Sequence, residues 1–131
     1  MPENFRDAAQ RHLGDATQLF IGNRLPNADH LFGISAECAL KAIMQGLHMS
    51  QPGLPPKVHM FKLWSAHNKL VNHYQPQLNA PANMFNNWSV EDRYLASTDQ
   101  KFIHATVASH QKAANDIMNV LTQALLDGVV K

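Results

Sequence analysis

Residues 28–44 read Ala-Asp-His-Leu-Phe-Gly-Ile-Ser-Ala-Glu-Cys-Ala-Leu-Lys-Ala-Ile-Met, and this stretch decides the fold. Its apolar side chains, continued to residue 47, recur at helical spacing, which predicts a helix with one face in a core. Pro26, just upstream, suits the first turn of this helix, where its missing N–H is harmless. Gly46 weakens the end of the helix.

The neighbouring segments also follow helical spacing. Apolar residues at three- and four-residue steps predict a helix over residues 5–20, and Gly22 with Asn23 supplies its stop. The prolines and the glycine between residues 50 and 56 forbid regular helix and indicate a long loop. A third helix is predicted over residues 58–74, where apolar side chains form a stripe.

The C-terminal part contains the clearest helical pattern. Residues 75–88 are predicted to be irregular, and Ser89 with Asp92 resembles a capping box that begins a short extra helix. One of residues 97–99 is expected to cap the last helix, whose apolar positions run over residues 103–125. These patterns predict an all-α fold, an up-and-down helical bundle of four main helices plus the short extra helix.

The composition fits one domain without a membrane span. The 131 residues are 45% hydrophobic, so the chain can bury a continuous core, and we predict a single domain over residues 1–131. The net charge of +1 excludes an overall basic field, so any contact with nucleic acid must come from a local patch. The single cysteine, Cys38, and the absence of a long apolar run predict a cytoplasmic protein.

The helix quoted first resembles the signature helix of the HEPN (higher eukaryotes and prokaryotes nucleotide-binding) superfamily. Residues 37–42 are similar to the Glu-x-x-x-Lys-Ala element common in that family. His59 and Leu63 resemble the His and Leu that often open its third helix, and Arg93-Tyr94 resembles the Arg-Tyr that often precedes its long last helix. The resemblance implies a HEPN-like bundle that forms a homodimer.

Many HEPN domains are metal-independent ribonucleases that use an Arg and a His, separated by four to six residues, near the start of the last helix. In this chain ten residues separate Arg93 from the next histidine, His104, so the sequence departs from that motif. Two other pairs have the family spacing but lie in or before the first two helices, and we interpret them as coincidences: Arg6 with His12, and Arg24 with His30.

Arg93 and His104 are nevertheless the candidate catalytic residues. They are eleven residues apart, close to three helical turns, and would share a face of a continuous helix. A guanidinium group there would stabilise a phosphoryl transition state while an imidazole moved a proton. In the alternative interpretation, Arg93 pairs with a carboxylate or caps a helix, and His104 lies on the bundle surface.

Glu37, Lys41 and His59 are the candidate binding residues. Glu37 and Lys41 are one turn apart, so an ordinary helical ion pair is the alternative. The histidines lack the four-residue step that places two imidazoles on a metal, and we predict neither metal nor cofactor. We expect His110 to be a hydrogen-bonded core histidine and Cys38 an inert buried thiol.

Three functions remain open at this point. The first is a non-catalytic or atypical HEPN-like domain that binds RNA, a nucleotide or a partner protein. The second is a metal-independent endoribonuclease of the toxin or defence type. The third is a structural dimerisation module, since small helical bundles often supply only a surface.

Overall fold

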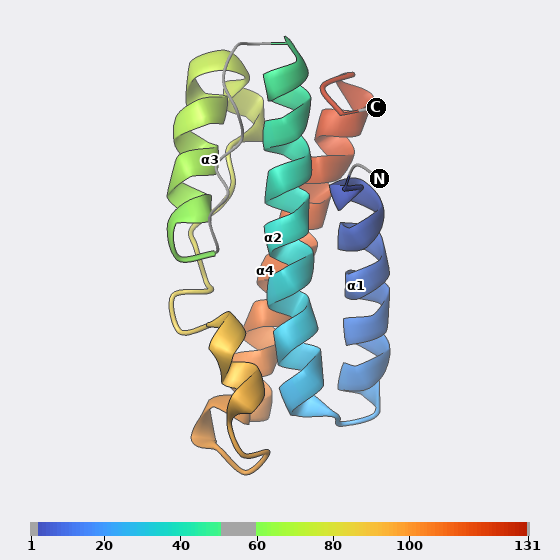
Figure 1. Ribbon diagram of the computed structural model, residues 1–131, viewed down its shortest axis with the longest axis vertical. Coiled ribbons are helices and arrows are strands. Elements are labelled where there is room, and N and C mark those ends of the chain that lie inside the picture. Colours follow the sequence, from blue (N-terminus) through green and yellow to red (C-terminus); the bar gives the residue numbers. More distant parts are fainter. Residues whose placement is uncertain (1–2, 51–59, 131) are drawn as a thin grey trace.

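The computed structural model describes residues 3–50 and 60–130 and arranges them as a bundle of helices (Figure 1). No strand occurs within these two ranges, so the predicted all-α bundle is confirmed. The bundle contains four α-helices, α1 (Phe5–Ile21), α2 (Leu25–Ser50), α3 (Met60–Tyr74) and α4 (His104–Leu126). Three short 3₁₀ helices lie between α3 and α4, namely η1 (Pro76–Leu78), η2 (Val90–Tyr94) and η3 (Gln100–Phe102).

The directions of the helices differ from a simple up-and-down order. Figure 1 shows α1 antiparallel to α2, whereas α4 runs in the same direction as α2. Near their starts, α2 and α4 are joined by Asp29 and His110, and near their ends Gly46 lies against Val129. Residues 75–103 make this arrangement possible because they run back along the bundle before α4 begins (Figure 1).

The core lies where α2 meets the other three α-helices. On α1, Ala9 and Ala16 are fully buried, and such small side chains let α1 and α2 approach closely. The Ser35 hydroxyl of α2 donates a 2.7 Å hydrogen bond to the Ala9 carbonyl of α1, which satisfies a buried polar group between the two helices. The largest apolar side chains that are fully buried come from α2, α3, η1, α4 and the stretch between η1 and η2: Phe32, Leu40, Ile43, Met44, Met60, Leu63, Leu78, Phe85, Ile117 and Leu121.

Two predicted boundaries are confirmed in detail. α1 ends at Ile21, and Asn23 follows with a positive φ of 59°, a conformation that asparagine tolerates better than most residues. The capping box is also present, because the Ser89 hydroxyl accepts from the Glu91 N–H and the Asp92 carboxylate accepts from the Ser89 N–H. This box begins η2, the short extra helix of the prediction.

The predicted cap of the last helix is wrong. Asp99 caps η3 instead, since its side chain accepts a 2.9 Å hydrogen bond from the Lys101 N–H. The backbone of Ile103 is then extended, with ψ of 148°, so η3 cannot continue into α4. Ile103, which was expected on the buried stripe, is therefore 54% exposed at the N-cap position of α4.

A helix must be both long and apolar to cross a membrane. Among the helices of residues 3–50 and 60–130, none is both long enough and apolar enough to cross a bilayer.

A buried histidine in α3 makes stability depend on pH. The His67 ring is fully buried, its Nδ1 lies 2.9 Å from Asn68 Oδ1, and its Nε2 has no hydrogen-bond partner. Burial lowers the pKa of His67 below 6.5, although the Asn68 hydrogen bond opposes this. The His67 imidazole therefore takes up a proton more readily in the unfolded chain than in the folded chain. As a result, the free energy of unfolding falls as the pH drops through about 6.5.

We expect the His67→Gln variant to show a weaker loss of stability between pH 7.5 and pH 5.5 than the wild-type protein. Because His67 can bind only one proton, it changes the free energy of unfolding by at most about 1.4 kcal/mol per pH unit. Some dependence of stability on pH should remain in the variant, because burial also lowers the pKa values of His12 and His30. Urea unfolding at each pH measures the free energy of unfolding, and the His73→Gln variant is the control because His73 is exposed. Equal slopes for all three proteins would contradict the assignment to His67.

Candidate functional site

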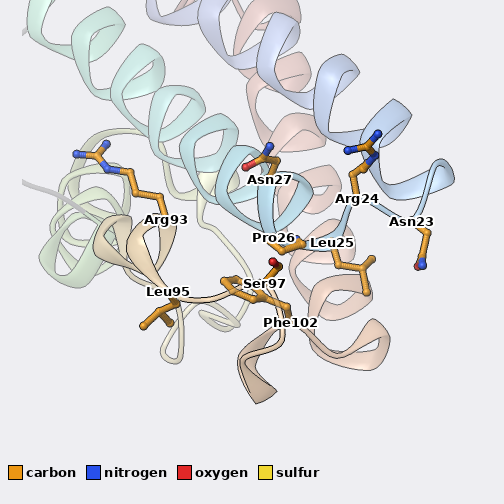
Figure 2. A pocket seen from close by; sticks show the side chains of 9 residues that line it. All are labelled: Asn23, Arg24, Leu25, Pro26, Asn27, Arg93, Leu95, Ser97 and Phe102. Atoms are coloured by element: carbon orange, nitrogen blue, oxygen red, sulfur yellow. The ribbon is translucent and has the colours of Figure 1, made fainter.

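An open cleft lies at the end of the bundle where α1 turns into α2. Its volume is about 560 Å³, and two parts of the chain line it from opposite sides. One wall is the turn and first residues of α2, and the other is the segment from η2 to η3 (Figure 2). The lining residues are Asn23, Arg24, Leu25, Pro26, Asn27, Arg93, Leu95, Ser97 and Phe102.

The charge of the cleft is positive because its two ionisable side chains are both arginines. Arg24 comes from the turn before α2 and Arg93 from η2. Figure 2 shows Asn27 between the two side chains, with the Arg93 guanidinium pointing outward on one side and the Arg24 guanidinium on the other. The first turn of α2 also lines the cleft, where Pro26 has no N–H but the N–H groups of Leu25 and Asn27 lack partners within the helix. An anion is the ligand that such an arrangement favours.

The local structure of η2 keeps the Arg93 guanidinium in solvent. Asp92, the neighbouring carboxylate, is buried and accepts from the Ser89 N–H and from Lys101 Nζ at 3.1 Å. Arg93 instead donates a 2.9 Å hydrogen bond to the Tyr94 hydroxyl and lies 4.9 Å from the centre of the Tyr94 ring. Within the part of the chain that the structure describes, no carboxylate oxygen lies within 4.0 Å of Arg93.

Two hydrogen-bonded contacts hold the segment before η2 against the helices. The Trp88 indole donates a 2.9 Å hydrogen bond to the Asp29 carbonyl of α2. The adjacent Asn87 lies 2.7 Å from His110 Nε2, and His110 Nδ1 lies 2.5 Å from Asp29 Oδ1. Trp88 and His110 are both buried, so these contacts fix where η2 begins and hence where Arg93 stands.

The structure does not bring Arg93 and His104 together on one helix. η2 ends at Tyr94 and α4 begins at His104, with an extended residue just before it. The His104 ring packs against Phe20 of α1, with the ring centres 4.8 Å apart. His104 is therefore an exposed residue at the start of α4 that contacts α1, and it does not line the cleft.

Glu37 and Lys41, two of the predicted binding residues, also lie outside the cleft. Glu37 Oε2 and Lys41 Nζ are 3.9 Å apart within α2, which is the ordinary helical ion pair. Lys41 Nζ additionally lies 5.7 Å from the centre of the Phe5 ring. His59 lies outside the described residues. Of the four described residues that were expected at a site, Glu37, Lys41, Arg93 and His104, Arg93 alone lines the cleft.

Sequence reasoning missed two residues near Arg93. Arg24, dismissed with His30 as a chance match to the family spacing, lines the same cleft as Arg93. Burial lowers the pKa of His30, and the positive charge of Arg93 lowers it further. The His30 ring stacks on Trp88 with 6.3 Å between ring centres, and its Nδ1 is buried without a hydrogen-bond partner. His30 is therefore a histidine whose pKa the charge of Arg93 affects, and the sequence did not single it out as a site residue.

The remaining reactive groups show no sign of a metal or nucleophilic site. Burial raises the pKa of the Cys38 thiol to about 11, which favours the inert thiol at neutral pH. Among the described residues, no three His, Cys, Asp or Glu side chains gather as metal ligands.

No protein-family model matches the chain, and neither a curated protein nor a solved structure matches it. The likeness to HEPN domains therefore stays a prediction from residues 37–42, His59 and Arg93-Tyr94.

Proposed function

We propose that the protein binds phosphate groups of RNA or of a nucleotide in the cleft between Arg24 and Arg93, as a non-catalytic HEPN-like domain. The observation that carries this proposal is the pair of arginines on facing walls, in a cleft with no acidic side chain among its lining residues. We expect the protein to act in the cytoplasm as a homodimer.

The chemistry of the lining residues suits a phosphate ester. A guanidinium group offers planar N–H donors that match two phosphate oxygens at once, and it stays charged at any physiological pH. Asn27 and Ser97 add neutral polar groups on the two walls, and Leu25, Pro26 and Phe102 supply an apolar lining. A ligand that combines phosphate with a less polar part fits this composition better than a small inorganic ion.

Binding is favoured over cleavage because the two candidate catalytic residues lie apart. Arg93 lines the cleft, whereas His104 does not line it and packs on Phe20 at the start of α4. A metal-independent endoribonuclease and a purely structural dimerisation module stay alternatives, and the experiment that tests binding separates them.

Titration of fluorescein-labelled single-stranded RNA and of labelled ATP, followed by anisotropy, tests the proposal. We expect Arg24→Ala and Arg93→Ala each to weaken binding by about tenfold or more, because each removes a charge-assisted contact to phosphate. The salt dependence of binding should also become shallower in each variant. Arg6→Ala is the matched control, since Arg6 is an exposed arginine at the opposite end of α1.

The outcomes of this experiment are distinct. Equal affinities for the wild-type protein and the two cleft variants would overturn the cleft as the binding site, and no binding of either ligand would favour the structural alternative. The same RNA mixtures, run on a gel after incubation in excess EDTA, report cleavage. Cleavage that is lost in both Arg93→Ala and His104→Ala would replace the binding proposal with the endoribonuclease.

A further inference from the structure

Tyr94 is a large aromatic side chain that the fold leaves in solvent. It is 75% exposed at the last position of η2, whereas Phe85, Trp88 and Phe102 of the same connection are buried. Scattered exposed apolar residues are ordinary on protein surfaces, and Leu126 at 77% is one here. Tyr94 differs from such residues because of its neighbours.

The two sides of the Tyr94 ring have different surroundings. The Arg93 guanidinium lies over the ring at 4.9 Å from its centre and donates a hydrogen bond to the ring hydroxyl. These two contacts limit the rotation of the Tyr94 side chain. Because the ring is largely exposed, the face away from Arg93 is open to a flat ligand group.

The position of Tyr94 relates this open face to the cleft. The residues on either side of it in sequence, Arg93 and Leu95, both line the cleft. A ligand that contacts Arg93 through a phosphate group therefore has an aromatic ring beside that same guanidinium, 4.9 Å from it. Nucleobases stack on such rings, whatever their sequence, because every base has a π face.

We propose that Tyr94 stacks a nucleobase of a single-stranded nucleic acid whose backbone phosphates occupy the cleft. This inference rests on the proposed phosphate binding and narrows its ligand class. A duplex is disfavoured, since its base faces are covered by their neighbours in the stack. Tyr94 thus makes the site select unpaired, base-bearing strands over duplexes and over bare sugar-phosphate.

The test compares three labelled ligands of equal length, an oligouridylate, an abasic strand with the same backbone, and an RNA duplex. We expect the wild-type protein to bind the oligouridylate at least about fivefold more tightly than the abasic strand. Tyr94→Ala and Tyr94→Leu should reduce the affinity for oligouridylate to that for the abasic strand. Tyr94→Phe should retain the preference, because stacking needs the ring and not the hydroxyl.

The leucine variant separates stacking from general apolar contact, and the exposure of Tyr94 makes all three variants compatible with folding, which circular dichroism verifies. Equal binding of the oligouridylate and the abasic strand by the wild-type protein would overturn the stacking role. If Arg24→Ala still weakened both ligands in that case, phosphate binding would stand. No binding of any strand by the wild-type protein would overturn the stacking proposal and the binding of RNA in the cleft, and the titration with labelled ATP decides nucleotide binding separately.

Discussion

Alanine in place of His110 should lower the free energy of unfolding by about 3–5 kcal/mol, a large part of the stability of a domain of this size. The His110 ring is only 1% exposed and lies 2.5 Å from Asp29 Oδ1 through Nδ1. The Asp29 side chain is 3% exposed, so the variant leaves a buried carboxylate without its imidazole partner. A cavity where the ring stacks on Phe85 adds to the loss.

The charge of this pair can be found by a second substitution. Both ring nitrogens of His110 face an oxygen, since Nε2 lies 2.7 Å from Asn87 Oδ1. In this orientation of the Asn87 amide, hydrogen bonds to both oxygens require N–H groups on both ring nitrogens, and the substitution Asp29→Asn tests that arrangement. Asp29→Asn should then destabilise strongly, whereas a neutral ring beside a turned Asn87 amide would tolerate asparagine with a smaller loss.

Urea unfolding of His110→Ala and Asp29→Asn at pH 7 measures both effects. The control is Lys112→Ala, also in α4, because Lys112 Nζ and Asp116 Oδ2 are 2.9 Å apart but Lys112 is highly exposed. An exposed pair of this kind contributes about 0.5 kcal/mol or less. A loss for His110→Ala as small as that for Lys112→Ala would show that the buried pair does not hold α2 and α4 together.

The features that local sequence determines were predictable. Gly22 and Asn23 end α1 as expected, because asparagine accepts the backbone conformation found there. The Ser89 capping box follows from side-chain hydrogen bonds to backbone within three residues. His110 was expected as a core histidine because it interrupts an apolar stripe, and its burial confirms this.

The direction of α4 and its first residue were not predictable in the same way. Spacing places apolar residues on a helix face but does not say which neighbour covers it. The contact of His110 with Asp29, 81 residues earlier, belongs to a parallel arrangement that the local pattern does not contain. Asp99 is a good cap by residue type, but only the extended backbone at Ile103 decides that it caps η3 and not α4.

The candidate site shows the same division between local and distant information. Arg93 was singled out through the Arg-Tyr resemblance, and the structure places it in the cleft. Arg24 was dismissed because its spacing to His30 occurs outside the family position. The cleft exists only because residues 93–102 lie against the start of α2, and no spacing in either segment encodes that contact.

The second large effect is expected at Gly33, which packs under the segment that positions Arg93. A Cβ atom at Gly33 would overlap the Trp88 indole, a buried ring with little room to move. We expect Gly33→Ala to lower the free energy of unfolding by about 1–3 kcal/mol through overpacking. Gly14→Ala is the control, because a Cβ there meets no atom within 4 Å, and it should stabilise α1 by about 0.5–1 kcal/mol.

The clash at Gly33 also connects stability with the cleft. Displacement of Trp88 strains its hydrogen bond to the Asp29 carbonyl and moves the start of η2, so Gly33→Ala should weaken RNA binding even in conditions where the variant is fully folded. A smaller ring should relieve the overlap, and on a Trp88→Phe background Gly33→Ala should cost less than it does alone. Thermal unfolding measures the stability losses, near-ultraviolet circular dichroism reports the packing of Trp88, and the anisotropy titration measures RNA binding. If the double variant lost as much stability as the two single variants together, the Gly33→Ala effect would not come from contact with Trp88.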